Sequence, residues 1–519
     1  MHLVPALQDL PETPFGSFAE QVGQRAHERP EHPAVVVDDA VMTYAELWAL
    51  TQRVAAGLQR DGLRPGDVAM ICTPSSAAYV ACYVGCLLTG VVVAPVSPSL
   101  RDNTLATLVK DSGARLIFTD SEIAARLAAQ ADAAAVPRVV LEGADEDFSR
   151  WLPAVGTPVQ TFTPQPEDGF NLIYSSGTTG VPKGILQPHS MRWAHLQRAI
   201  NSGYGPSAVT LLGTPLYSNT TLVSALPTVG LGGTLVLMRK FDAGDYLKLA
   251  VRHRATHTML VPVQYQRILA HPDFDTSDLS SFQAKFCTSA PFSAAMKREV
   301  LRRWPGGLIE FYGMTEGGGS CILRAHEHPD KLHTVGQPAP GCVYLQLDEE
   351  GRILPPDEMG ELVSRGPAMM KGYHNQPEKT AEIEWFDADG LRYVRTGDMG
   401  RFDEDGFLVL MDRKKDMIIS GGFNIYPSDI EAELVQHPQV LAAAVVGVPS
   451  EAWGETPVAF VELREGGNVS SGELMTWLND RLEKNQRVAA VALVSQLPRS
   501  SIGKVLKREL RDGFAGSVR

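Results

Sequence analysis

Cysteine is scarce in this sequence, and the few cysteines show no metal-binding spacing. Six are present, at positions 72, 82, 86, 287, 321 and 342 of 519. Cys82 and Cys86 are spaced to share one helix face, but no histidine stands near them to complete a zinc site. We therefore expect reduced, buried thiols in a cytoplasmic protein, with neither a disulfide framework nor a structural zinc site.

Positive charge is also in deficit. The chain has 47 Lys and Arg against 60 Asp and Glu, a formal net charge of -13. Such a field repels polyanions, and the longest basic run is only Arg413-Lys414-Lys415, so a nucleic-acid partner is excluded. No Lys or Arg precedes Arg25, and no long apolar run opens the chain, so no signal peptide is expected.

Charge is missing altogether between Thr73 and Leu100, a stretch long enough to span a bilayer. Gly85, Gly90 and Pro95 interrupt this stretch, and three consecutive valines follow Gly90. The pattern favours a buried helix followed by a buried strand, and no membrane span is expected.

The length of 519 residues exceeds what one hydrophobic core organises, so two or more lobes are expected. Short apolar runs bounded by turn residues alternate with helical patterns, which predicts α/β layers around largely parallel strands. These runs cover residues 34–37, 68–71, 90–95 and 116–119. Thr43 with Glu46 three positions on has the form of a helix N-cap.

The character of the chain changes after the strand pattern at 406–411. Five consecutive charged residues, Asp412-Arg413-Lys414-Lys415-Asp416, precede about a hundred residues that have their own strand patterns at 440–448 and 458–461. The sequence thus predicts a large N-terminal α/β domain over 1–411 and a small α+β C-terminal domain over 412–519.

The strongest local signal is the segment 173–184, which reads Ile-Tyr-Ser-Ser-Gly-Thr-Thr-Gly-Val-Pro-Lys-Gly. Hydroxyls, backbone N–H groups and one lysine complement a polyphosphate. The spacing to Lys183 differs from that of a Walker loop. Taken alone, such a loop is also compatible with an ordinary surface turn.

This loop closely resembles the phosphate loop of the adenylate-forming superfamily, which includes acyl-CoA synthetases, adenylation domains of nonribosomal synthetases and luciferases. Five further segments resemble the family's motifs in the family's order. They are Phe311–Glu316 (adenine and magnesium), Tyr393–Asp398 (ribose), Asp412–Asp416 (hinge), Ser420–Pro427 (thioester formation) and Leu497–Lys504 (C-terminal catalytic loop). The resemblance implies an acyl-CoA synthetase with a mobile C-terminal domain that uses ATP, Mg²⁺ and coenzyme A.

The resemblance also assigns roles to the matching residues. Nucleotide binding falls to Ser175, Ser176, Gly177, Thr178, Thr179, Lys183, Ser289, Ala290, Tyr312, Gly313, Asp398 and Arg413. Catalysis falls to Lys504, Thr315 and Glu316, with Glu316 as the magnesium ligand. Coenzyme A binding falls to Lys415, Gly421 and Gly422, the hinge to Asp412, and the acyl pocket to Tyr217, Ser218, Val263, Gly313 and Gly318.

These roles agree with the chemistry of the side chains. A carboxylate such as Asp398 can accept both ribose hydroxyls, and Glu316 offers the hard oxygen that Mg²⁺ prefers. Attack of a carboxylate on the α-phosphorus brings two anions together, and a lysine such as Lys504 lowers that cost.

Some positions depart from the family's pattern. Thr288 and Ser289 stand where many relatives carry Gly-Gly, Tyr217-Ser218 replaces an aromatic-His pair, and Arg487-Val488-Ala489 replaces Lys-x-Pro. A member specialised for one half-reaction therefore stays open, as do loading of a carrier-protein phosphopantetheine, a luciferase-type oxygenase and a nucleotide sensor without turnover.

The segments that match the acyl-pocket lining of relatives are 217–219, 261–264, 288–290, and Gly313 with 317–319. None holds an aspartate for a substrate ammonium or a Lys or Arg for a second carboxylate, so a neutral hydrophobic monocarboxylic acid is expected. Three glycines after Glu316 suggest room for a broad acyl group. The sequence is compatible with a homodimer but carries no specific signal for one.

Overall fold

The computed structural model of the protein describes residues 7–175, 183–413, 416–420, 423–450, 453–484, 486–500 and 504–517. The chain forms two compact units. The larger unit holds the described residues up to Leu332, with Pro338–Val343 and Ser364–Val394. The smaller holds His333–Gln337, Tyr344–Val363 and the described residues from Arg395 onward. The expected mixed α/β fold, with a large N-terminal domain and a small C-terminal domain, is confirmed. Asp412 lies in β24 (Leu408–Arg413), and its role as a hinge stays a prediction.

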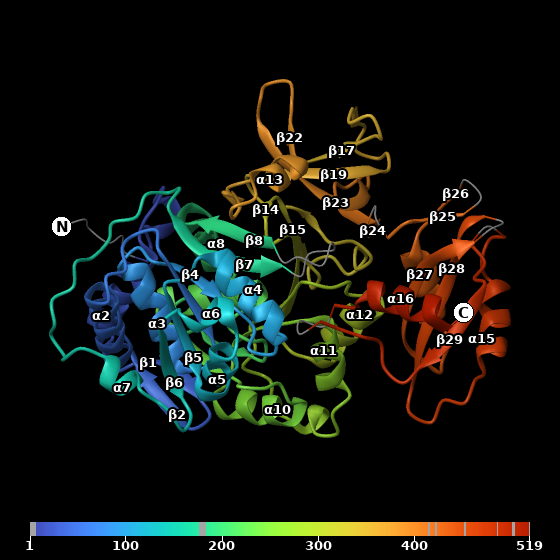
Figure 1. Ribbon diagram of the computed structural model, residues 1–519. Helices are drawn as coiled ribbons and strands as arrows, with labels where there is room; N and C mark the ends of the chain where they lie inside the picture. Colours follow the sequence, from blue (N-terminus) through green and yellow to red (C-terminus); the bar gives the residue numbers. More distant parts are fainter. Residues whose placement is uncertain are drawn as a thin grey trace. The chain divides into compact units, whose positions relative to one another are not determined.

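One sheet of the larger unit has seven strands in the order β21-β8-β7-β4-β3-β5-β6. Its strands β7 and β8 lie side by side in Figure 1. The strands are β3 (Val68–Cys72), β4 (Val92–Pro95), β5 (Leu116–Asp120), β6 (Arg138–Glu142), β7 (Gly169–Ser175), β8 (Lys183–Pro188) and β21 (Gly372–Tyr373). Strands β7, β4, β3, β5 and β6 pair in parallel, and β8 returns antiparallel to β7. Alternate residues of β3 enter two different hydrophobic clusters, so both faces of this sheet are covered.

A second sheet runs β15-β13-β12-β11-β9-β10-β1-β2 within the larger unit. Its strands are β1 (Pro33–Val37), β2 (Ala40–Thr43), β9 (Val209–Leu212), β10 (Thr234–Leu237), β11 (His257–Leu260), β12 (Ala284–Cys287), β13 (Gly307–Gly313) and β15 (Ser320–Arg324). Six neighbouring strands, in the order β1, β10, β9, β11, β12 and β13, pair in parallel. On either side of these six strands, β2 pairs antiparallel with β1 and β15 pairs antiparallel with β13. The carboxyl ends of the six parallel strands therefore lie along one edge.

Helices join the two sheets through one large hydrophobic core. This core contains residues of α1 (Phe18–Glu28), α2 (Tyr44–Arg60), α3 (Ala77–Leu88), α8 (His189–Ile200) and α9 (Asn219–Gly230). On the other face of the seven-stranded sheet pack α4 (Asp102–Ser112), α5 (Ser121–Ala128) and α6 (Ala131–Ala134). Near the second sheet, α10 (Ala243–Arg252) and α11 (Pro262–Leu269) place Tyr246 and Tyr265 against Trp304, which follows α12 (Ala294–Arg303).

Several local patterns form as predicted. The four apolar runs become β1, β3, β4 and β5, and Thr43 and Glu46 form a reciprocal capping box at the start of α2. The uncharged stretch after Thr73 folds as α3 followed by β4, both buried. Among the described residues, no helix is long and apolar enough to cross a membrane. The segment 142–168 contains the short helix α7 (Phe148–Trp151).

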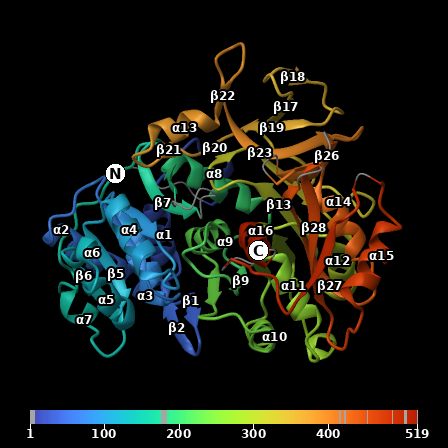
Figure 2. The same ribbon diagram turned by 45° about the vertical axis from the view of Figure 1, so that its right-hand side comes forward.

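Most residues of β17 (Val343–Leu347), β19 (Gly360–Arg365) and β23 (Arg392–Phe402) belong to the smaller unit, as does β24, and these strands pair edge to edge in that order. A further sheet has the order β26-β25-β28-β27, with β29 beside β28. Its strands are β25 (Ile418–Ser420), β26 (Phe423–Ile425), β27 (Val440–Ser450), β28 (Gly454–Leu463) and β29 (Ala490–Val494). The helices α14 (Pro427–Leu434), α15 (Ser471–Asn479) and α16 (Lys507–Ser517) pack against this sheet (Figure 2). The strand patterns predicted at 440–448 and 458–461 are confirmed.

Short elements complete the fold. They are the helix α13 (Pro377–Ile383), the 3-10 turns at Leu10–Glu12 and Phe274–Thr276, and the strands β14 (Gly317–Gly318), β16 (Gln337–Pro338), β18 (Ile353–Leu354), β20 (Ala368–Met369) and β22 (Glu384–Phe386).

Candidate active site

Four predicted site segments follow four neighbouring parallel strands. Tyr217 and Ser218 follow β9, Val263 follows β11, Ser289 and Ala290 follow β12, and Thr315 and Glu316 follow β13. The carboxyl ends of parallel strands meet at one sheet edge, which is where open α/β sheets bind ligands. The fold therefore places four segments spread over residues 217–316 on a common edge, with Tyr312 and Gly313 at the end of β13 itself.

The predicted phosphate loop lies between the two antiparallel strands of a β-hairpin, β7 and β8. Ser175 ends β7, Lys183 begins β8, and the two residues are direct cross-strand partners. Ser176, Gly177, Thr178 and Thr179 lie outside the described residues. The hairpin thus fixes the two residues at the base of the loop, and Lys183 is one of them.

A tyrosine links Lys183 to Glu316. The Tyr373 hydroxyl donates a hydrogen bond to Glu316 Oε1 at 2.8 Å, and the Lys183 ammonium lies 4.8 Å from the centre of the Tyr373 ring. Burial and the negative charge of Glu316 raise the pKa of Tyr373, so the hydroxyl stays protonated and donates. Tyr373 reaches this position because β21 pairs with β8.

The acyl-pocket segments carry a bridge of two hydroxyls. Ser289 Oγ and Thr220 Oγ1 lie 2.5 Å apart, joining the turn after β12 to the first turn of α9. Ser289 has a φ of +79°, in the left-handed region that favours glycine. This conformation gives a physical reason for the glycine of relatives at this position. Ser218 is buried at the N-cap of α9 without a side-chain capping bond.

Backbone conformation and close packing require glycine at two positions after Glu316, and the sequence did not predict this requirement. Gly317 and Gly318 have φ of +78° and +93° and form β14, which pairs closely with β20. A Cβ on Gly317 would lie 2.1 Å from the Ala368 carbonyl oxygen, and one on Gly318 would lie 2.7 Å from Ser364 Oγ. Their lack of side chains is required by the backbone and is no longer support for a wide acyl pocket. A pocket-lining role for Gly318 stays a prediction.

In the smaller unit, the two predicted ribose ligands are neighbours. Asp398 on β23 and Arg413 on β24 are direct cross-strand partners, and the Asp398 backbone N–H donates to Thr396 Oγ1. The Ser500 backbone N–H donates to the Lys504 carbonyl oxygen, the Lys504 backbone N–H donates to Ser500 Oγ, and the Lys504 side chain is exposed. Lys415, Gly421 and Gly422 lie outside the described residues.

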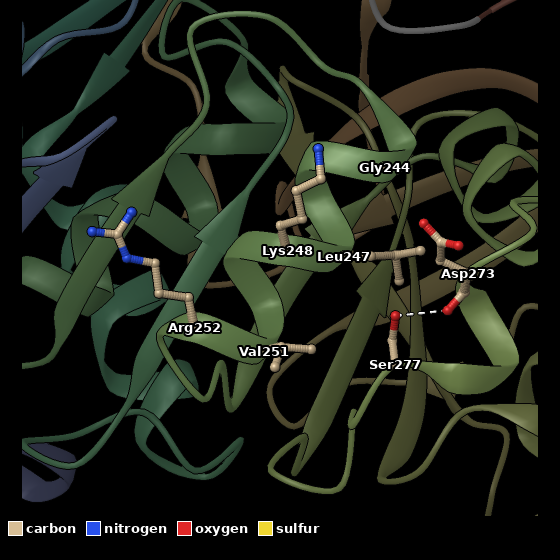
Figure 3. Close-up of a pocket in the computed structure, with 7 residues that line it drawn as sticks. All are labelled: Gly244, Leu247, Lys248, Val251, Arg252, Asp273 and Ser277. Atoms are coloured by element: carbon tan, nitrogen blue, oxygen red, sulfur yellow. Dashed lines mark hydrogen bonds between the residues drawn. The ribbon is translucent and has the colours of Figure 1, made fainter.

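A surface groove of about 350 Å³ lies apart from these residues (Figure 3). It is lined by Gly244, Leu247, Lys248, Val251, Arg252, Asp273 and Ser277. Its two cations are already paired, Lys248 with Asp245 and Arg252 with Asp39, and Ser277 donates to the Asp273 carbonyl. No predicted site residue lines this groove, so we assign it no role in the chemistry.

Comparison with known families agrees with this arrangement. The profile of AMP-binding enzymes matches residues 22–374, and that of the AMP-binding enzyme C-terminal domain matches residues 429–504. The chain belongs to the AMP-binding enzyme family. It is an adenylate-forming acid–thiol ligase, as the resemblance of its motifs implied.

Relatives match over nearly the whole chain. A feruloyl-CoA synthase of Amycolatopsis is 35% identical, covering 95% of this chain and 98% of that protein. The fatty acid–[acyl-carrier-protein] ligase ScoC of Streptomyces coeruleorubidus is 33% identical, covering 99% and 98%. The structure of o-succinylbenzoate CoA synthetase from Bacillus subtilis with its acyl-adenylate intermediate has a TM-score of 0.83 and 28% identity, covering 95% and 98%.

The described residues of the larger unit fit the ATP and Mg²⁺ that AMP-binding enzymes use. Glu316 is partly exposed and offers carboxylate oxygen, the ligand type that Mg²⁺ prefers, while Tyr373 fixes one of its two oxygens. Lys183 adds a cation at the base of the loop for an anionic polyphosphate.

Proposed function

We propose that this protein activates a neutral, hydrophobic monocarboxylic acid as its acyl-adenylate and transfers the acyl group to coenzyme A. The observation that carries the proposal is the sheet edge that gathers Tyr217, Val263, Ser289 and Thr315 at adjacent carboxyl ends. The similarity to feruloyl-CoA synthase supports both the thiol and an apolar acid.

The predicted site residues of the two units have different parts in the chemistry. Lys183 balances phosphate charge, and Thr315 donates to the α-phosphate that the substrate carboxylate attacks. Mg²⁺, bound through Glu316, would withdraw charge from the phosphates and favour the departure of pyrophosphate. Lys504 neutralises the charge that concentrates as the two anions meet, and Asp398 with Arg413 holds the ribose. The acyl group then passes to the thiol, with AMP as leaving group.

The class of acid is inferred from the charge of the pocket segments. The residues 217–219, 261–264 and 288–290 contain no acidic or basic side chain. A substrate ammonium or second carboxylate would lose its hydration there without a partner of opposite charge, and that loss is unfavourable. Amino acids and diacids should therefore be poor substrates.

The test is to incubate the protein with ATP, Mg²⁺, coenzyme A and an acid panel, and to identify acyl-CoA products by mass. The panel contains acetate, malonate, phenylalanine, octanoate, and aromatic and polycyclic carboxylic acids. The expected products come from octanoate or the larger apolar acids. A strong preference for acetate, malonate or phenylalanine would contradict the proposed class of acid.

Transfer to the phosphopantetheine of a carrier protein is a second candidate, favoured by the 33% identity to the ligase ScoC. A parallel incubation replaces coenzyme A by a phosphopantetheinylated carrier protein and measures its mass. Acylation of the carrier with no acyl-CoA formed would replace the first candidate by this one.

A further inference from the structure

A buried arginine, Arg192, is hydrogen-bonded to no carboxylate among the described residues. Arg192, on α8, is 4% exposed and burial lowers its pKa to about 10, so it is charged at neutral pH. Its partners are three neutral amide oxygens. Arg192 Nε donates to Asn171 Oδ1 at 2.9 Å, and Nη2 donates to Gln187 Oε1 at 2.5 Å and Asn219 Oδ1 at 2.9 Å.

A buried arginine with only amide partners contributes little to the stability of the fold. Removing a guanidinium from water is unfavourable, and amide dipoles return less of that free energy than a carboxylate does. A well-packed apolar residue would serve a purely structural role at least as well. The position of the contacts therefore points to a role in the site.

Gln187 connects Arg192 to Thr315 through hydrogen bonds. Its Oε1 accepts from Arg192 and from Asn171 Nδ2, and its Nε2 donates to the Thr315 carbonyl oxygen at 2.6 Å. Arginine can only donate and a carbonyl can only accept, so these two partners fix which way the Gln187 amide faces. Arg192 thus orients the group that holds the Thr315 backbone.

Asn219 connects Arg192 to the segment of the predicted acyl pocket through a second hydrogen bond. It is the first residue of α9 and directly follows Tyr217 and Ser218, and its Oδ1 accepts from Arg192. One buried cation therefore ties the backbone beside the predicted α-phosphate donor to the start of the helix beside the predicted acyl pocket.

We propose that Arg192 is a positioning residue for adenylation, holding Thr315 through Gln187 and the start of α9 through Asn219. This inference rests on the proposed function, because it assigns Thr315 to the adenylation step. It adds two residues, Arg192 and Gln187, that act through Thr315 and Asn219.

Two variants of Gln187 separate positioning from folding. Gln187→Glu keeps an oxygen acceptor for Arg192 and gives it a buried counter-charge, but presents an oxygen to the Thr315 carbonyl. Gln187→Met removes both bonds. We expect both variants, and Arg192→Met, to lower kcat of acid-dependent pyrophosphate release by about 10- to 100-fold, because a buried hydrogen bond is lost in each. KM for the acid should change by less than about threefold.

The second readout is acyl-CoA formation from supplied acyl-adenylate, which a defect confined to Thr315 leaves within about threefold of wild type. Arg25→Met is the matched control, since Arg25 is a 1% exposed arginine on α1 that bonds only Glu28 among the described residues. It should alter neither half-reaction.

The outcomes separate the alternatives. Equal losses in both half-reactions, or Gln187→Glu with wild-type kcat, would overturn the positioning role. A rise in KM alone, or a wild-type preference for diacids that Arg192→Met abolishes, would make Arg192 a substrate-binding residue instead. If Arg192→Met does not fold, the two Gln187 variants decide the matter. Absence of adenylate from wild type with every acid would refute the proposed function and this inference with it, whereas the outcomes above overturn the inference alone.

Discussion

At the scale of single residues, Tyr373 shows how one uncharged group can set the geometry of a charged one. Its hydroxyl occupies one oxygen of Glu316, which limits the directions in which the carboxylate can meet Mg²⁺. The residue lies far along the chain from Glu316 and belongs to no motif quoted from the sequence. Only the pairing of β21 with β8 brings it to the site.

Tyr373→Phe should weaken the use of Mg²⁺ while leaving the fold intact. Loss of a hydrogen bond to a charged group corresponds to about 1.5 kcal/mol, or about tenfold, so the apparent Mg²⁺ concentration for half-maximal pyrophosphate release should rise about tenfold. Tyr265→Phe is the control, because its hydroxyl bonds the Phe286 carbonyl within the core. An unchanged Mg²⁺ dependence in Tyr373→Phe would show that Glu316 needs no orientation by this residue.

Ser289→Gly should change specificity more than stability. Glycine relieves the left-handed strain of roughly 1–2 kcal/mol, but it loses the bond to Thr220, roughly 1 kcal/mol, and makes the unfolded chain more flexible. These effects nearly cancel. We expect kcat/KM for polycyclic acids to rise several-fold relative to octanoate, because a side chain leaves the pocket wall. Thr220→Val removes the bond but keeps the volume, and an equal gain there would attribute the effect to the hydroxyl bridge.

At the scale of elements, the pairing of β14 with β20 depends on glycine. Gly317→Ala would place a methyl group against the Ala368 carbonyl in a backbone conformation that alanine disfavours. We expect a loss of about 3 kcal/mol or more in free energy of unfolding, measured by urea denaturation. Gly62→Ala is the control, because Gly62 has a φ of +81° but no atom within 4 Å of the added Cβ. Its loss should be only about 1 kcal/mol. Equal losses would assign the whole effect to φ.

The same elements show what the sequence can predict. Strands β1, β3, β4 and β5 and the capped start of α2 depend on patterns within a few residues, so they were predictable. The phosphate loop and the four segments after parallel strands were predicted through the resemblance to the family, and their roles stay predictions. Arg192 was not, because nothing local distinguishes a buried arginine on α8 from a solvated one. The reason for Gly317 and Gly318 also escaped prediction, since their partner strand is distant in the chain.

At the scale of the whole molecule, the predicted catalytic and nucleotide-binding residues are divided between the two units. Thr315 and Glu316 belong to the larger unit, and Asp398 and Lys504 to the smaller. We predict that Lys504 serves adenylation and not thioester formation, because the repulsion between carboxylate and phosphate arises only in the first step.

Lys504→Ala should therefore separate the half-reactions. Loss of one transition-state contact corresponds to about 3–4 kcal/mol, so acid-dependent pyrophosphate release should fall about 100- to 1000-fold. Conversion of supplied acyl-adenylate to acyl-CoA should stay near the wild-type rate. Lys507→Ala is the matched control, because Lys507 begins α16 three residues later and pairs with Glu431 in the same unit, so it should leave both rates unchanged. A folded Lys504→Ala protein that loses both half-reactions equally would show that the lysine acts in both steps or supports the smaller unit as a whole.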